Sequence, residues 1–181
     1  TVGIETQRGC PFTCAFCNSP AQNVLYRDAV GTTFNRRKSV AKIREELEYL
    51  VERYDPELIY WVADTFLAMP EKDWEEFYKM YMDFRIPFWM NTRAETVNDK
   101  RAEHLEKMNC LRMNIGIEHG NEEYRKQVLK RTPSNAKIIE YFERIADSGI
   151  AFSLNLIMGM PGETRELIMD TVEFVRSIRG F

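Results

Sequence analysis

The sequence is organised around residues 9–17, which read Gly9-Cys10-Pro11-Phe12-Thr13-Cys14-Ala15-Phe16-Cys17. This stretch holds three of the chain's four cysteines, in the spacing C-x3-C-x2-C. An odd number of cysteines cannot pair off as disulfides, and a zinc site would need a fourth ligand. The only two histidines, His104 and His119, lie far along the chain. Because a 4Fe–4S cluster is usually held by four thiolates, three of them favour a cluster with one iron left open, over zinc or a structural thiol group.

The same stretch resembles a family signature. An aromatic residue, here Phe16, directly before the third cysteine is similar to the motif of radical S-adenosylmethionine (radical SAM) enzymes. The leading Gln7-Arg8-Gly9-Cys10-Pro11-Phe12 resembles the branch that often carries a cobalamin-binding domain, and the neighbouring methylthiotransferases. The resemblance implies a 4Fe–4S cluster on Cys10, Cys14 and Cys17, with its open iron chelated by SAM. In the family, reduction cleaves SAM to a 5′-deoxyadenosyl radical that abstracts hydrogen from the substrate.

Length and composition are those of a globular protein. The chain has 181 residues, 44% hydrophobic and 29% charged, which suggests one domain with a substantial core. A net charge of −3 gives no sign of a general nucleic-acid surface, and no apolar run is long enough to span a membrane. Without a signal peptide, and with cysteines set aside for an oxygen-sensitive site, we expect a cytoplasmic location. Both ends look cut, so we interpret residues 1–181 as a radical SAM core domain excised from a longer chain.

Strand and helix patterns alternate along the whole sequence. Short apolar runs predict strands at 2–5, 58–62, 87–90, 111–117 and 151–158. Helical periodicity predicts helices at 40–54, from 70 onward, at 98–108, 121–130 and 134–148, and from 164. Residues 18–37 show no clear period and are interpreted as a long functional loop. Because no hairpin signal separates the strands, the alternation predicts an α/β fold with a parallel sheet.

The positions of the polar residues favour a barrel-like sheet. Each predicted strand is apolar and then delivers polar groups at its carboxyl end, namely Cys10–Cys17, Asp64, Arg93, Glu118 and the turn at 159–163. In βα barrels the active site is built at that end. No G-x-G-x-x-G follows the first strand, which makes a dinucleotide-binding fold the weaker interpretation. The resemblance implies a partial, open βα barrel, with about five βα units present of a core of about six.

The resemblance also implies contacts to SAM from the first three strand ends. Phe16 lies against the adenine in the family, although it would also shield the cluster from water. Asp64 would accept from the SAM ammonium, with a helix N-cap as the alternative. Arg93 would bind the SAM carboxylate, with an ion pair to Glu95 or Glu118 as the alternative.

The fourth and fifth strand ends supply the remaining contacts implied by the resemblance. Glu118 would contact the SAM ribose or amino group, and Arg131 the carboxylate, unless Arg131 is a solvated helix end. Ile157 and Met158 would give apolar contact to the adenine, and strand alternation points Asn155 the same way as Ile157.

Three further residues are expected to be structural. We interpret His119 as a surface residue and not a ligand. Glu163 is expected to brace the turn before the last helix. Cys110, alone beside a strand start, is expected to be a buried thiol without a role in the cluster.

The leading hypothesis is therefore a radical SAM enzyme core, with cobalamin-dependent methyl transfer as the implied reaction of the branch it resembles. The cobalamin would be bound by a domain outside this chain. A methylthiotransferase acting on RNA or protein is the first alternative, a non-catalytic zinc module the second, and an iron–sulfur carrier the third. The resemblance implies SAM as a partner and an electron donor such as flavodoxin or ferredoxin. The substrate is unknown.

Overall fold

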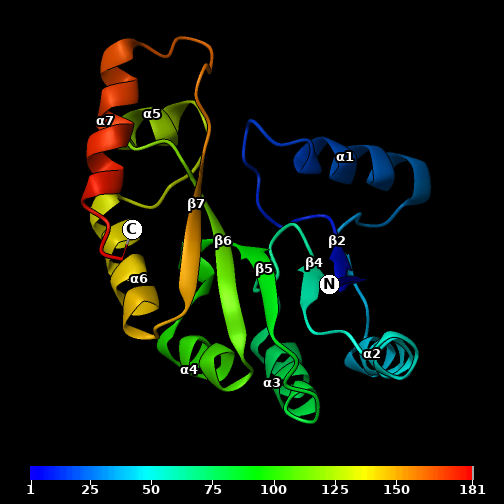
Figure 1. The fold of residues 1–181 in the computed structure, drawn as a ribbon. Coiled ribbons are helices and arrows are strands. Elements are labelled where there is room, and N and C mark those ends of the chain that lie inside the picture. Colours follow the sequence, from blue (N-terminus) through cyan, green and yellow to red (C-terminus); the bar gives the residue numbers. More distant parts are fainter. Residues whose placement is uncertain (181) are drawn as a thin grey trace.

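One parallel sheet of five strands, in the order β1-β4-β5-β6-β7, forms the centre of the computed structural model, which describes residues 1–180 (Figure 1). Its strands are β1 Val2–Glu5, β4 Ile59–Val62, β5 Phe88–Thr92, β6 Cys110–Glu118 and β7 Ala151–Leu156. Every neighbouring pair is parallel. The prediction of an α/β fold with a partial βα barrel is confirmed, and the parallel strands direct all their carboxyl ends to one edge.

Six helices begin within one residue of their expected starts. They are α2 Val40–Tyr54, α3 Glu71–Tyr81, α4 Asp99–Lys107, α5 Glu122–Gln127, α6 Asn135–Asp147 and α7 Arg165–Arg176, with a 3-10 turn η1 at Ala94–Thr96. The side chains of Ser39, Asn98, Ser134 and Thr164 each accept a hydrogen bond from a backbone N–H in the first turn of the helix that follows. None of the helices within residues 1–180 combines the length and the apolar character needed to cross a membrane.

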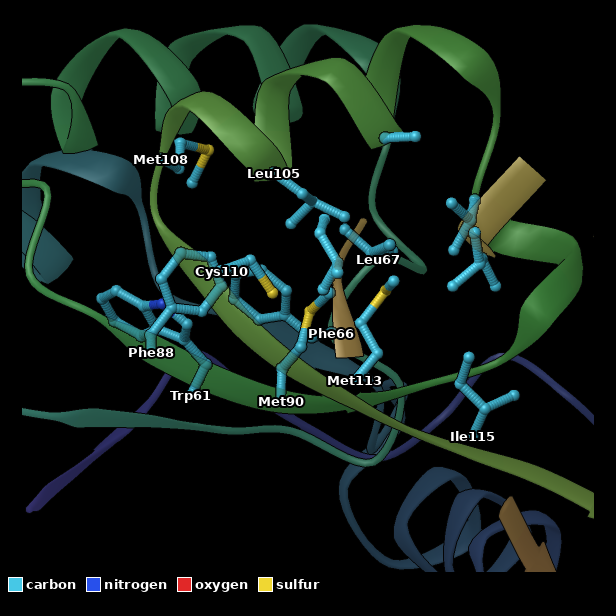
Figure 2. Packing of buried hydrophobic residues seen from close by; sticks show 14 of the residues in the cluster. Trp61, Phe66, Leu67, Phe88, Met90, Leu105, Met108, Cys110, Met113 and Ile115 are labelled. Carbon is cyan, nitrogen blue, oxygen red and sulfur yellow. The ribbon is translucent and has the colours of Figure 1, made fainter. Parts of the chain in front are cut away.

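The hydrophobic core lies between the sheet and the helices that cover one of its faces (Figure 2). Burial alternates along the strands, so that Trp61 of β4, Met90 of β5 and Met113 of β6 are fully buried. Trp61 packs edge-on against Phe77 and Tyr81 of α3, with ring centres 5.2 and 5.3 Å apart. The aromatic side of α3 therefore serves packing.

The prediction of a long loop at 18–37 is wrong. Residues Ser19–Val30 form helix α1, which has a proline in its first turn and ends at Gly31. The φ of Gly31 is 75°, and its N–H donates to the carbonyl of Arg27 at 2.8 Å, as in a left-handed helix cap. Ser19 is the only buried residue of α1, so this helix has no apolar face packed against the core. Its sequence therefore lacks the periodic apolar pattern by which helices are predicted.

Other boundaries differ by a few residues. The strand expected to reach residue 158 ends at Leu156, and the helix expected at 121–130 covers only Glu122–Gln127. A small antiparallel pair, β2 Gln7–Arg8 with β3 Arg36–Arg37, was not predicted, because two-residue strands carry no periodic signal. This pair joins the residues just before the cysteine loop to the segment that follows α1.

Candidate active site

The candidate site is a cavity of about 700 Å³ at the carboxyl ends of the strands. It is lined by nine residues named from the sequence: Cys10, Cys14, Phe16, Cys17, Asp64, Arg93, Glu118, Arg131 and Asn155. These residues come from positions 10 to 155 of the chain and meet because parallel strands end at one edge of the sheet. Ile157 and Met158 do not line this cavity. Met158 is 53% exposed, and both residues follow the end of β7.

Each cysteine sulfur of the loop has a polar partner from a different segment. The Sγ of Cys10 lies 3.5 Å from the hydroxyl of Thr65, and the backbone N–H of Ser19 donates to the Sγ of Cys17 at 3.4 Å. Arg93 Nη1 donates to the Sγ of Cys14 at 3.1 Å. Such contacts stabilise thiolates, which are the form of cysteine that binds metal.

The loop that carries the cysteines is attached to the body of the protein at several points. The N–H of Ala15 donates to the carbonyl of Leu129 at 3.1 Å, and the Nδ2 of Asn23 donates to the carbonyl of Cys10 at 3.2 Å. Gly9 precedes the loop with a φ of 77°, and a Cβ there would lie 3.1 Å from the backbone of Asn35. The conformation and the space both require glycine at this position.

The three cysteines fit a thiolate-bound cluster. Among residues 1–180, no three His, Cys, Asp or Glu side chains gather closely enough to hold one metal ion. The cysteines of the loop instead border one cavity, all as free thiols, and each sulfur has its own hydrogen-bonding partner. In an iron–sulfur cluster the thiolates bind different irons, and hydrogen bonds to the sulfurs tune its reduction potential. Residues 10, 14 and 17 would hold such a cluster.

Glu118 and Arg131 form a partly buried ion pair on the cavity wall. Arg131 Nη1 donates to Glu118 Oε1 at 3.0 Å and to the carbonyl of Gly116 at 2.8 Å. Arg131 is only 5% exposed, so the alternative of a solvated helix end is wrong. Burial raises the pKa of Glu118, although the positive charges of Arg131 and Arg93 oppose this effect.

Two backbone features shape the end of β6 around that carboxylate. A Cβ at Gly116 would overlap the Glu118 carboxylate. The carboxylate therefore occupies space that is free only because residue 116 is a glycine. Glu118 itself has a φ of 70°, and the register of β6 against β7 shifts between Gly116 and Glu118. Non-glycine residues at positive φ are strained, and such strain gathers at functional sites.

Arg93 is bonded within the protein. Its Nε donates to Glu95 Oε1 at 2.7 Å, which is one of the ion pairs given above as the alternative to a SAM contact. Its guanidinium also lies 3.8 Å from the ring centre of Phe12, in a cation–π contact. Arg93 thereby joins the cysteine loop to the end of β5, and it still borders the cavity.

Asp64 is exposed on the cavity wall. It belongs to no ion pair that residues 1–180 form, and the next helix, α3, begins only at Glu71 with Pro70 as its cap residue. The alternative role of Asp64 as a helix N-cap is therefore wrong. A carboxylate that faces the cavity in this way can accept hydrogen bonds from a ligand cation.

The interpretation of His119 as a surface residue is wrong. His119 is fully buried, and its Nε2 lies 3.1 Å from Oε1 of Glu163, whose side chain is 2% exposed. The prediction for Glu163 is confirmed, because its Oε2 accepts from the backbone N–H groups of Gly159 and Met160. The sequence gives no sign of this burial, because the residues that cover His119 come from other segments of the chain.

Cys110 differs from the other cysteines, as expected. It is 7% exposed on the core side of the sheet, and burial raises the pKa of its thiol to about 12. A thiol with this pKa is protonated at neutral pH and is a poor metal ligand.

Sequence reasoning missed the floor of the cavity. Tyr60, Asn91 and Asn114 line it from β4, β5 and β6, and Ser153 of β7 extends the row. Ser153 donates to Asn114 Oδ1 at 2.5 Å, Asn114 Nδ2 donates to Asn91 Oδ1 at 3.2 Å, and Asn91 Nδ2 donates to the Tyr60 hydroxyl at 2.6 Å. The signal was present in the sequence as a polar residue within three of the apolar runs, at Tyr60, Asn114 and Ser153, and directly after the fourth, at Asn91.

Comparisons with known proteins agree with the fold and the cysteine motif. The sequence profile of the radical SAM superfamily matches residues 4–175, and the chain belongs to this superfamily. A methyltransferase of Pyrococcus horikoshii described as uncharacterised, PH0819, is 27% identical over 97% of this chain and 36% of its own length. The ribosomal protein uS12 methylthiotransferase RimO of Thermosipho melanesiensis is 25% identical over 97% of this chain and 41% of its own.

A solved structure has the same fold. The radical SAM methyltransferase TsrM of Kitasatospora setae, determined with cobalamin and a 4Fe–4S cluster bound, superposes with a TM-score of 0.77 at 16% identity. The match covers 97% of this chain and 32% of TsrM. The chain thus spans about a third to two fifths of the length of these relatives. As a radical SAM protein it is an enzyme of a family that uses a 4Fe–4S cluster together with SAM.

Proposed function

We propose that this chain binds a 4Fe–4S cluster through Cys10, Cys14 and Cys17 and cleaves SAM reductively at the cavity beside it. The observation that carries the proposal is the grouping of three hydrogen-bonded cysteine sulfurs in one cavity with opposite charges on its walls. When bound, the cluster would supply the electron that converts SAM into a 5′-deoxyadenosyl radical, which abstracts hydrogen from a substrate. The residues of the chain hold and orient both cofactors.

The charged walls match the two charges on the amino-acid part of SAM. The exposed Asp64 carboxylate faces the cavity and would accept from the SAM ammonium. Arg131 and Arg93 would bind the SAM carboxylate, and both are now bonded to the carboxylates of Glu118 and Glu95. The SAM carboxylate would therefore compete with Glu118 and Glu95 for the two guanidinium groups.

The adenosine part of SAM would lie along the remaining wall. Glu118 would accept from the ribose or amino group, and Phe16 would contact the adenine. Asn155 borders the same cavity from the end of β7. Ile157 and Met158 remain proposed adenine contacts, and for them SAM would have to extend past the cavity toward the turn at 157–163.

The reaction that follows radical formation is proposed from the relatives. Methyl transfer with cobalamin bound by a further domain is favoured by the likeness to TsrM, a methyltransferase whose structure contains cobalamin. Methylthiolation of RNA or protein is the second candidate, because the match to RimO covers 97% of this chain. A flavodoxin or ferredoxin would supply the electron, and a cytoplasmic location would protect the cluster.

Anaerobic reconstitution with iron and sulfide, followed by electron paramagnetic resonance of the reduced protein with and without SAM, tests the proposal. We expect a 4Fe–4S signal that changes shape when SAM is added, and 5′-deoxyadenosine in the mixture. Cys14→Ala should abolish the cluster, whereas Cys110→Ala, the matched control on the core side, should keep it. Uptake of zinc instead, or a cluster whose spectrum ignores SAM, would contradict the proposal.

A further inference from the structure

A buried histidine–glutamate contact lies behind the cavity wall, outside the set of residues proposed to touch SAM. His119 Nε2 and Glu163 Oε1 are 3.1 Å apart, and neither side chain is more than 2% exposed. Neither atom has a hydrogen-bond partner among residues 1–180, so this ion-pair contact is the polar contact on which both rely. Buried polar atoms are costly when unpaired, so each of these two depends on the other.

One hydrogen bond to the imidazole indicates its tautomer. The backbone N–H of Asn121 donates to His119 Nδ1 at 3.0 Å, so Nδ1 carries no proton. The proton of the neutral ring is therefore on Nε2, which faces Glu163. Arg125 holds the same residue from the backbone side, because its Nη1 donates to the His119 carbonyl at 2.8 Å.

Glu163 carries this contact into the turn that follows β7, residues 157–163. Its second carboxylate oxygen, Oε2, accepts from the N–H groups of Gly159 and Met160. Tyr124 of α5 adds a second attachment: its ring lies 4.5 Å from the His119 ring, and its hydroxyl donates to the carbonyl of Pro161 at 2.9 Å. The turn is thus tied at two points to the segment that follows β6.

We infer that His119 is a positioning residue that holds the 157–163 turn at a fixed distance from Glu118 and so shapes the adenosine side of the SAM site. Glu118 and His119 are adjacent in the chain, and the N–H of Ile157 donates to the Glu118 carbonyl at 2.9 Å. One end of the turn is fixed by this backbone bond and the other by the buried pair. The inference rests on the proposed function, since the ligand that it concerns is SAM.

Two substitutions of His119 distinguish the contribution of Nε2 from that of Nδ1. His119→Gln keeps a donor near the position of Nε2, whereas His119→Asn keeps an acceptor near Nδ1 and loses the donor to Glu163. His104→Gln is the matched control. His104 is also buried, with Trp74 Nε1 donating to its Nδ1 at 3.1 Å, but it lies in α4 and does not border the cavity.

Two measurements are needed: the Kd for SAM of the anaerobically reconstituted proteins, and amide hydrogen exchange of residues 157–163 without SAM. For His119→Asn we expect about a tenfold higher Kd and faster exchange confined to 157–163. His119→Gln should stay within about twofold of the parent Kd, and His104→Gln should leave both measurements unchanged even if it lowers stability. Tyr124→Phe, which loses only the bond to Pro161, should shift both measurements less.

Parent-like exchange at 157–163 in His119→Asn would overturn the inference, as would faster exchange with unchanged SAM affinity. An equal loss of affinity in His104→Gln would also overturn it, because the effect would then be one of general stability. If the parent itself fails to bind SAM, the proposed function fails. The exchange data alone then decide whether His119 holds the turn. Tyr124→Phe serves as the test if His119→Asn does not fold.

Discussion

The two sides of the strands differ in what they bury and in what they leave available. Along β6, Met113 and Ile115 are fully buried against the helices, whereas Asn114 and Glu118 border the cavity. The core side is held by the packing of apolar groups. The cavity side is held by directed bonds between polar groups, which a ligand can exchange for its own. The same backbone therefore supports a side that determines stability and a side that determines binding.

Alkylation of the cysteines gives the largest expected contrast between the two sides. Because burial raises the pKa of Cys110 from 9.0 to about 12, its thiolate fraction falls about a thousandfold. Treating the metal-free protein with iodoacetamide should label Cys17, which is exposed, long before Cys110. Peptide mass spectrometry measures both rates. Labelling of Cys110 as fast as Cys17 would show that the core side opens readily.

Substitutions at two neighbouring residues of β6 compare how much each side contributes to the free energy of unfolding. Met113→Ala should lower the free energy of unfolding by about 2–5 kcal/mol, because it leaves a cavity in the core. Asn114→Ala should cost only about 1 kcal/mol, since water in the open cavity can replace the lost hydrogen bonds. Urea denaturation of both variants measures the difference. Equal losses would mean that the polar floor is also part of the stabilising core.

Gly116→Ala sharpens the comparison on the cavity side. The new methyl group would overlap the Glu118 carboxylate and displace it from Arg131. We expect a loss of about 1–3 kcal/mol in the free energy of unfolding, typical of overpacking. Gly3→Ala is the control, because its Cβ would meet only a side-chain methyl of Val62, at 3.3 Å. A Gly116→Ala protein as stable as Gly3→Ala would contradict the placement of the carboxylate.

The pH dependence of stability gives the smallest expected effect. Because burial raises the pKa of Glu118 above its ordinary 4.5, the folded protein holds this proton more tightly than the unfolded chain. The stabilisation from this group is complete below that ordinary value and is lost as pH rises through the raised pKa. Relative to the parent, Glu118→Gln should therefore become more stable as pH rises. The gain in the free energy of unfolding should be about 1.4 kcal/mol for each unit by which folding raises the pKa of Glu118. Urea denaturation of both proteins across this pH range measures the gain. A difference that stays flat with pH would show that Arg131 and Arg93 cancel the effect of burial.

The two sides also differ in how well the sequence predicts them. The core side was predicted because apolar residues repeat with the period of the strand or helix, as in Leu58–Val62 and in α2. That the three loop cysteines border one cavity was predicted because they lie close together in the sequence. The burial of His119 and the existence of helix α1 were not predicted. His119 is covered by segments distant in sequence, and α1 packs through polar residues without a period.

The row of hydrogen bonds on the cavity floor has one direction. Ser153 donates to Asn114, Asn114 to Asn91 and Asn91 to Tyr60, so both amides use their oxygen and their nitrogen within the row. Rotating Asn91 alone would set its NH2 group against that of Asn114, and rotating Asn114 alone would set its oxygen against that of Asn91. The direction of the hydrogen bonds can therefore reverse only if both amides rotate together. A ligand that made Tyr60 donate to Asn91 would require Asn91, Asn114 and the Ser153 hydroxyl of β7 all to reorient.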